Sequence, residues 1–276
     1  AAAFEGSSVA HGQTTVGSVR KNGKTEAKSF IVREPLTKTL VAAHLEGGHG
    51  VGSIPINDQN MCKFGALDID TYPVDHVEIL KKCRRFKLPL VVCRSKSGGA
   101  HLFLFMQDWI SATDMRDHLT EFAAVLGFGG CEVFPKQNKI LAERGDVGNF
   151  INLPYFEAEN TLRYAINSKG DDLSLEEFLN QVDKIKCTLE DLRNLEFSSD
   201  DDELREMPPC LRIMFATSVP DGTRNKVMFH AAVTAKMMYP ASWETTLEKW
   251  NQKFCKPSLP ANEIVTIQSQ HKKKDY

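Results

Sequence analysis

The sequence has little that would place it in a membrane, in an oxidising compartment or among zinc-ribbon proteins. No apolar run approaches the roughly 20 residues of a membrane-spanning helix, and no charged and then apolar stretch opens the chain as in a signal peptide. Its seven cysteines are odd in number and include no Cys-x-x-Cys pair, which argues against a disulfide framework and a zinc ribbon. We therefore expect a cytoplasmic protein, in a bacterial or host-cell cytosol, with reduced thiols, no zinc and no membrane partner.

A strong excess of positive charge is also missing. Lysine and arginine number 34 against 36 acidic residues, so the net charge of −2 does not by itself mark a nucleic-acid-binding domain. The charges are nevertheless uneven, because residues 81–87 and 271–274 are basic whereas residues 196–206 are acidic apart from Arg205. With 276 residues, 42% of them apolar, the chain has room for one large domain or two smaller ones.

Residues 64–70 form a short apolar run that carries two carboxylates one residue apart, Asp68 and Asp70. Side chains of a strand alternate between its two faces, so both aspartates point the same way. Neighbouring like charges repel each other, and a divalent cation between them would remove the repulsion. The run therefore suggests a metal site. The simpler alternative is a pair of solvated residues at a strand end, before the turn at 71–73.

The elements around this run follow the order strand, helix, strand, strand, helix, strand. Hydrophobic spacing, caps and turn residues predict them at 64–70, 74–86, 88–93, 100–106, 111–126 and 131–134. This is the split β-α-β-β-α-β order of ferredoxin-like and RNA-recognition folds. We expect an α+β catalytic sheet with both helices on one face and the other face free for a site.

The usual strand order of such sheets places the first strand between the third and the fourth. Asp68 and Asp70 would then be flanked by His101 on one side and by Glu132 on the other. Carboxylate oxygens suit Mg²⁺ or Mn²⁺, and the Gly-rich loop 97–99 offers N–H groups to an anion. A cation site beside a phosphate cradle is typical of nucleotidyl transfer by a two-metal route.

At these residues the sequence resembles the archaeo-eukaryotic primase superfamily, in the branch of primase-polymerases found in phages, plasmids and mobile elements. The resemblance covers roughly residues 35–160 and rests on four stretches in order, at 67–70, 97–101, 132–137 and 148–154. It departs from many relatives in having Glu132 as the third acidic residue where they have Asp, and no zinc-binding module is visible. The resemblance implies two divalent ions, Mg²⁺ or Mn²⁺, held by Asp68, Asp70 and Glu132, a nucleotide triphosphate held by Ser97, Gly98 and His101, and further positive charge from Arg94 or Lys136.

The rest of the first 195 residues is expected to complete this domain. Asn22-Gly23 suggests a hairpin turn, and residues 37–45, 173–185 and 188–195 have helical patterns with caps. We predict a catalytic domain at 4–195, an acidic linker at 196–206 and a bundle of four helices at 207–276. Trp243 and Trp250, seven residues apart, are expected in the bundle core.

The bundle resembles the helical module that follows the catalytic domain in phage and plasmid primases. The resemblance rests on residues 207–211, 222–226 and 243–254, and it implies a role in binding the template or the initiating nucleotide. Arg224, Asn225 and Lys226 stand at a predicted helix start, where N–H groups and cations favour phosphate. An ordinary polar first turn is the alternative.

These observations together predict a template-dependent DNA primase-polymerase. Its substrates would be a single-stranded DNA template and NTP or dNTP, and the chain would be the N-terminal part of a phage or mobile-element primase with a fused or associated helicase. A rolling-circle initiator nuclease is one rival, although it would use a His-x-His pair where this strand has His101 alone. A non-catalytic single-stranded nucleic-acid-binding module is the other, with Phe103 and Phe105 stacking bases on the open face.

Overall fold

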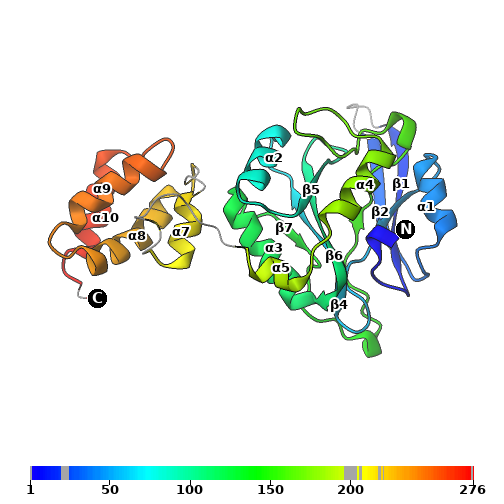
Figure 1. The fold of residues 1–276 in the computed structure, drawn as a ribbon, viewed down its shortest axis with the longest axis horizontal. Coiled ribbons are helices and arrows are strands. Elements are labelled where there is room, and N and C mark those ends of the chain that lie inside the picture. Colours follow the sequence, from blue (N-terminus) through cyan, green and yellow to red (C-terminus); the bar gives the residue numbers. More distant parts are fainter. Residues whose placement is uncertain are drawn as a thin grey trace. The chain divides into compact units, whose positions relative to one another are not determined.

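The computed structural model describes residues 2–19, 25–195, 204, 207–216, 219, 221–274 and 276. Internal contacts divide the chain into two compact units, and Figure 1 shows the elements of each. The first unit comprises residues 1–122 and 130–195, and the second comprises residues 123–129 and 196–276. None of the helices in the described part of the chain is long and apolar enough to cross a membrane.

The first unit is built on a four-stranded antiparallel sheet in the order β5-β6-β4-β7. Its strands are β4 (Met61–Ile69), β5 (Leu90–Arg94), β6 (Ala100–Ser111) and β7 (Glu132–Phe134). Helix α2 (His76–Arg85) connects β4 to β5, and helix α3 (Ala112–Leu126) connects β6 to β7. The predicted fold class, with the first strand of the motif between the third and the fourth, is confirmed.

Local signals explain where the two connecting helices begin. Asp75 caps α2 by accepting a hydrogen bond from the Glu78 amide (2.9 Å), and Ser111 accepts one from the Asp114 amide (3.0 Å) before α3. Gly65 of β4 leaves room for α3, because a Cβ atom there would lie 2.6 Å from the sulfur of Met115. The two helices therefore cover one face of the central sheet, as predicted (Figure 1).

The opposite face of the central sheet is covered, which corrects the expectation that it is free. A second sheet, in the order β2-β1-β3-β8, lies over it, and helix α4 adds Phe178 to the same apolar cluster as Phe64 and Phe105 (Figure 1). This layer comes from segments with weak periodicity, whose burial is decided by long-range packing. Its elements are β1 (His11–Val19), β2 (Thr25–Val32), β3 (Gly50–Ser53), β8 (Ile151–Asn152), α1 (Lys38–Leu45) and α4 (Leu175–Ile185).

The antiparallel pairing of β1 with β2 agrees with the predicted hairpin, although its expected turn at Asn22 and Gly23 lies outside the described residues. The remaining short elements of this unit are α5 (Leu189–Arg193) and three 3₁₀ turns, η1 (Ala2–Phe4), η2 (Ala142–Arg144) and η3 (Ala158–Asn160). Both α4 and α5 begin with a capping box, which accounts for their correct prediction from sequence.

The outer edge of β5 is paired with a later part of the chain. The Arg94 amide donates to the carbonyl oxygen of Tyr164 (2.8 Å), and the Ile166 amide donates to that of Val92 (3.1 Å). Cys93 and Ala165 form an antiparallel bridge between these bonds. Residues 162–166 therefore extend the central sheet beyond β5 without forming a regular strand.

The second unit is a helical bundle. Its helices are α7 (Pro209–Ala216), α8 (Arg224–Met238), α9 (Trp243–Phe254) and α10 (Ala261–His271). Trp250 is fully buried and Trp243 nearly so, which confirms their predicted place in the core. Most of the predicted acidic linker at 196–206 lies outside the described residues.

Candidate functional site

One row of side chains crosses the central sheet close to the end where β4 and β5 finish and where β6 and β7 begin. Asp68 is the register partner of His101 on β6 and of Glu132 on β7. His101 is in turn the partner of Cys93, which bridges to Ala165. Cross-strand partners share a face, so the sheet brings together Asp68, His101 and Glu132 as the sequence predicts.

A second row lies two residues further along each strand, at the sheet end. Because side chains repeat with a period of two, Asp70, Gly99, Ser95 and Arg163 belong to the same face as the first row. Gly99 confirms this arrangement, since a Cβ atom there would lie 3.0 Å from Asp70 Oδ1 and 3.1 Å from Ser95 Oγ. The missing side chain of Gly99 therefore leaves the Asp70 carboxylate and the Ser95 hydroxyl on either side of one small space.

Several polar atoms in these two rows have no hydrogen-bond partner. Within the described part of the chain, seven buried side-chain polar atoms lack one, and three of them are Asp68 Oδ1, Ser95 Oγ and Arg163 Nη1. Asp68 Oδ1 lies 3.3 Å from His101 Nε2, but the two do not form a hydrogen bond. A buried polar atom without a partner costs about 1–3 kcal/mol, so this concentration at one sheet end favours a bound ligand.

Arg163 is the most unusual member of this group. The residue is only 7% exposed, its guanidinium lies over the ring of Phe156 (5.4 Å), and burial lowers the pKa of that guanidinium. No carboxylate among the described residues lies within ion-pair distance of it. A buried cation without an anion is costly, and an anionic ligand would remove that cost.

The other two predicted metal ligands have weak local partners. Asp70 accepts a hydrogen bond from the Tyr72 hydroxyl (3.0 Å), and Glu132 pairs with Lys136 (2.9 Å), both at exposed positions. In this arrangement no group of three or more His, Cys, Asp or Glu side chains among the described residues is placed to hold a metal ion. The three carboxylates are thus neighbours in the sheet without converging on one point, and their metal role stays a prediction.

The negative charges of this site act on Cys131, which precedes β7. Burial, followed by the charges of Asp68 and Glu132, raises the pKa of the Cys131 thiol to about 11. The group is therefore a neutral thiol at physiological pH and a poor nucleophile.

The loop before His101 is an internally bonded turn. The Ser95 amide donates to the Gly99 carbonyl (2.8 Å), and the Gly98 amide donates to the Ser95 carbonyl (3.1 Å), so Gly98 has no free N–H to offer an anion. Gly98 adopts φ +90°, which favours glycine. Ser97 is exposed at the loop tip, whereas Ser95 is only 4% exposed. Of the two serines, Ser95 faces the two rows.

The two predicted additional cations lie apart from these rows. Arg94 follows Cys93 and therefore points to the α2 side of the sheet, where its Nη1 atom donates to the Leu162 carbonyl (2.9 Å). Lys136 stays beside Glu132 and over the ring of Phe134. Their contribution to a triphosphate site stays a prediction.

The aromatic side chains on this face are not available to stack bases. Phe103 and Phe105 are almost completely buried, and the ring of Phe4 lies within 5.1 Å and 5.3 Å of their centroids. The second layer covers them, so the base-stacking rival based on these two residues is wrong.

The predicted phosphate site of the bundle contains residues with other partners. Arg224 donates to the carbonyls of Pro257 and Ser258 and pairs with Asp221, and Asn225 donates to Glu263 (2.9 Å). The α8 start therefore holds the 257–263 segment in place. The role of these residues in binding nucleic acid stays a prediction.

Comparison with known proteins agrees with the class of protein that the sheet and its acidic row define. The model of the family AEP-TOTE, described as the Archaeo-Eukaryotic Primase domain of TOTE conflict systems, matches residues 10–188. The chain therefore belongs to this family of archaeo-eukaryotic primase domains. No curated protein matches it.

Two solved structures are similar to the chain at low identity. The AEP domain of the cyanophage S-2L primase-polymerase is 12% identical, with a TM-score of 0.33, and the match covers 63% of this chain and 89% of that one. The primase RepB′ is 12% identical, with a TM-score of 0.32, covering 96% of this chain and 94% of that one. At these scores neither neighbour assigns a role to any residue of this chain.

Ser95 and Arg163 are the site residues that the sequence did not indicate. Ser95 and Ser97 are equally plausible in a polar turn, and only the turn geometry separates them. Arg163 reaches the site because residues 162–166 pair with β5, a contact between segments about 70 residues apart in the chain. No local sequence pattern predicts such a pairing.

Proposed function

We propose that this protein is a template-dependent primase-polymerase that transfers nucleotides by a two-metal route at the Asp68 end of the central sheet. The observation that carries the proposal is the buried Oδ1 atom of Asp68, which has no hydrogen-bond partner and lies in one row with His101 and Glu132. An unpartnered carboxylate oxygen flanked by another carboxylate is the environment that a hard divalent cation stabilises. Mg²⁺ and Mn²⁺ both fit this donor set.

Three carboxylates would hold the ions. The free Oδ1 of Asp68 could bind an ion without breaking a hydrogen bond. Asp70 would give up its bond from Tyr72, and Glu132 its bond from Lys136. Both bonds are at exposed positions and cost little to break. Ions bound there would lower the pKa of the attacking 3′-hydroxyl and neutralise charge on the triphosphate. No side chain is then required as a general base.

The triphosphate would lie along the second row and above His101. Arg163 supplies a buried positive charge and Ser95 a hydroxyl donor, and each would gain a partner that it lacks in the protein alone. His101 would supply an imidazole N–H beside Asp68. Ser97 and Lys136 are exposed, and they would make weaker, solvent-screened contacts with the triphosphate. The N–H of Gly98 is bonded to the Ser95 carbonyl, so Gly98 would contribute only through the shape of the loop.

The bundle is proposed to bind the single-stranded DNA template or the initiating nucleotide. Residues 207–276 contain ten lysines and arginines against five acidic residues, so this part of a nearly neutral chain is basic. Lys226 is exposed at the start of α8 and is the member of the predicted phosphate site best able to reach a ligand. A fused or associated helicase remains part of the hypothesis.

A synthesis assay on single-stranded DNA tests the proposal. The assay compares three proteins: wild type, Asp68→Ala/Asp70→Ala and Asp108→Ala. Each is incubated with NTP or dNTP and with Mg²⁺ or Mn²⁺, in the presence and in the absence of a primer. Asp108 is the matched control because it is an exposed carboxylate of β6 outside both rows. Products from wild type and the control, absent in the double variant and after addition of EDTA, would support the polymerase.

The opposite result would favour another function. Wild type that makes no product yet binds single-stranded DNA equally well with and without EDTA would indicate a non-catalytic binding protein. Cleavage of the DNA with a covalently attached protein would indicate the initiator nuclease.

A further inference from the structure

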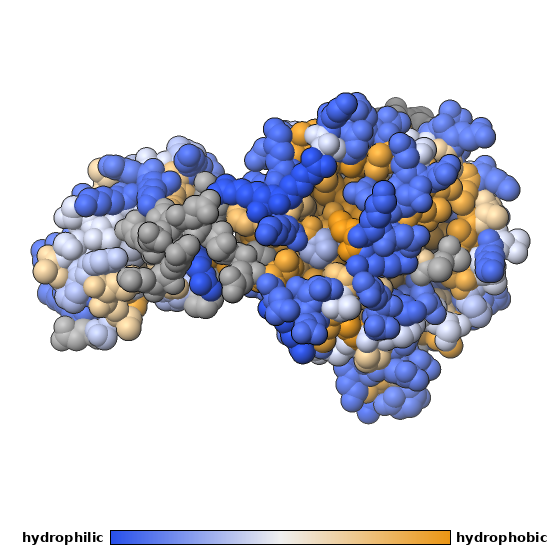
Figure 2. Space-filling model, in the orientation of Figure 1, coloured by the Kyte–Doolittle hydropathy of each residue, from blue (hydrophilic) through white to orange (hydrophobic). Residues whose placement is uncertain are grey.

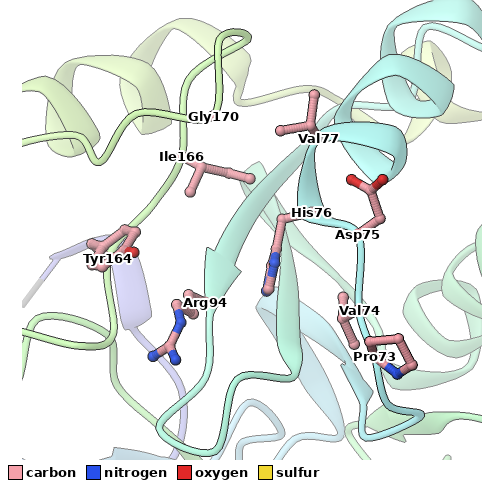
Figure 3. Close-up of a pocket in the computed structure, with 9 residues that line it drawn as sticks. All are labelled: Pro73, Val74, Asp75, His76, Val77, Arg94, Tyr164, Ile166 and Gly170. Carbon is pink, nitrogen blue, oxygen red and sulfur yellow. The ribbon is translucent and has the colours of Figure 1, made fainter.

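A cavity of about 420 Å³ lies on the α2 side of β5 and is not part of the two rows described above. It is lined by residues 73–77, which lead into and begin α2, by Arg94 at the end of β5, and by Tyr164, Ile166 and Gly170 (Figure 3). Its walls are mixed: the polar side chains of Asp75, His76 and Arg94 alternate with apolar or aromatic ones from Pro73, Val74, Val77, Tyr164 and Ile166. The volume is sufficient for a ligand of the size of a mononucleotide.

Two nitrogen-bearing side chains, Arg94 and His76, face this cavity (Figure 3). Arg94 donates to the backbone carbonyls of Leu162 and Ser95, and none of the ion pairs found in the described ranges includes it. The nearest acidic wall residue, Asp75, lies at the other end of the cavity and caps α2 (Figure 3). The cation at this end is therefore not neutralised by the protein.

His76 and Arg94 also contact the loop of residues 95–99. His76 Nε2 donates to the Gly99 carbonyl (2.9 Å), and Arg94 Nη1 lies 3.4 Å from the Ser95 carbonyl. The Gly99 position forms the small space between Ser95 and Asp70 on the other face. One loop thus separates the cavity from the candidate catalytic rows, and both cavity side chains hold its backbone.

The chemistry of the walls restricts the ligand. One cation at one end favours a single anionic group, such as a phosphate. The phenol ring of Tyr164 and the proline and aliphatic side chains favour a flat, weakly polar group beside it. A sugar phosphate alone would leave the apolar side chains of the walls in contact with water. An apolar ligand would leave the Arg94 guanidinium without an anionic partner.

We propose that this cavity is a second nucleotide site, in which Arg94 binds a phosphate and the base lies against Tyr164. The choice of a nucleotide over other aromatic phosphates rests on the proposed function. The nucleotide unit is either a free nucleotide or one residue of a single strand, since both present the same phosphate and base. The ligand would share Arg94 and His76 with the loop 95–99, whose Gly99 borders the candidate catalytic rows on the other face.

A binding measurement without metal separates this site from the catalytic one. Equilibrium binding of AMP, ATP, tripolyphosphate and a short oligo(dT) is measured in EDTA with the Asp68→Ala/Asp70→Ala protein, in which the metal-dependent site is removed. Nucleotide binding that persists in this protein is expected. Because the bundle is itself proposed to bind single-stranded DNA, only the binding that is lost in Arg94→Gln is assigned to the cavity. If that part is weaker for AMP than for oligo(dT), the source is a strand, and the reverse identifies free nucleotide. No binding of any nucleotide, or binding of tripolyphosphate as tight as that of ATP, would overturn the proposal.

Variants of the cavity complete the test. In the same background, Arg94→Gln is expected to weaken AMP or oligo(dT) binding at least tenfold, and Lys96→Gln serves as the matched control because it removes one exposed cation from the same loop. Val74→Glu keeps Arg94 and places a carboxylate in the cavity, which should repel the phosphate or occupy Arg94 and have a similar effect. Unchanged binding in both Arg94→Gln and Val74→Glu would overturn the proposal whether or not the wild type synthesises DNA.

Discussion

The end of the central sheet and the start of helix α8 both collect polar side chains that the sequence marks as phosphate or metal ligands, but the two regions differ in their partners. At the sheet end, Asp68, Ser95 and Arg163 each keep a buried atom without a hydrogen bond. At the start of α8, the terminal nitrogens of Arg224 reach two backbone carbonyls and a carboxylate, although its Nε has no partner.

This difference supports the proposal of a ligand site at the sheet end and of a structural contact at α8. Natural proteins leave few buried polar atoms unsatisfied, so several of them on one face need an external partner. Arg224 instead stabilises its own unit by holding the 257–258 backbone. Sequence motifs indicate Asp68 and Arg224 alike as candidate ligands, and hydrogen bonding distinguishes them, because only the sheet end collects several unpartnered atoms on one face.

The largest effect is expected from Asp68→Ala. Loss of a proposed metal ligand should lower the rate of nucleotide incorporation at least about a thousandfold, while the melting temperature stays the same or rises because an unsatisfied buried oxygen is removed. Primer-extension rates and thermal unfolding measure the two quantities. An Asp68→Ala protein with wild-type synthesis would refute the metal assignment.

Arg163→Gln tests whether the buried cation serves a ligand. The KM for nucleotide should rise about ten- to a hundredfold with a smaller change in kcat, and stability should not fall, since the variant removes an uncompensated charge. Steady-state kinetics and chemical denaturation are compared with the wild type. A large loss of stability with an unchanged KM would make Arg163 structural, like Arg224.

His101→Ala is expected to have a more modest effect. It should raise the apparent KM for nucleotide about tenfold, because one of several phosphate donors is lost. His118→Ala is a suitable control, since that histidine belongs to α3 and packs near Phe122. An unchanged KM in His101→Ala would dismiss its phosphate role.

The bundle side of the comparison is tested with Arg224→Ala and Lys226→Ala. Arg224→Ala should lower the free energy of unfolding by about 1–3 kcal/mol through the loss of its backbone contacts. Lys226→Ala should leave the free energy of unfolding unchanged and weaken DNA binding a few-fold. The slope of log K against log salt concentration should fall by about one released ion. The reverse pattern would place the ligand contact at Arg224.

The smallest effect concerns His44, a structural histidine of the first unit. Its Nδ1 accepts from the Val51 amide, its Nε2 donates to the Pro154 carbonyl, and burial lowers its pKa below the ordinary value of 6.5. The neutral ring is therefore favoured in the folded state, and the free energy of unfolding should decrease as pH falls below about 6.5. Denaturant titrations between pH 7 and 5 should show a shallower pH dependence for His44→Gln than for wild type. Equal slopes would contradict this role.

The predictable part of the fold is the part specified by local signals. The capped helices α2 and α3 and the strands around Asp68 follow from spacing and turn residues, and the strand order then places His101 and Glu132 beside Asp68. The second layer was missed because β1, β3 and β8 are short or weakly patterned, and their burial comes from pairing across the chain. The position of Arg163 depends on the same kind of long-range pairing, whereas the choice between Ser95 and Ser97 depends on the backbone geometry of the turn at 95–99.

The pairing of residues 162–166 with β5 also protects the sheet. An exposed strand edge offers unpaired N–H and C=O groups to other chains and is a common start of aggregation. Here the bonds of Tyr164 and Ile166 occupy that edge, and the same segment delivers Arg163 to the opposite face. If Arg163 binds nucleotide as proposed, one short stretch of backbone serves both solubility and nucleotide affinity, and a proline at Ile166 would be expected to impair both together.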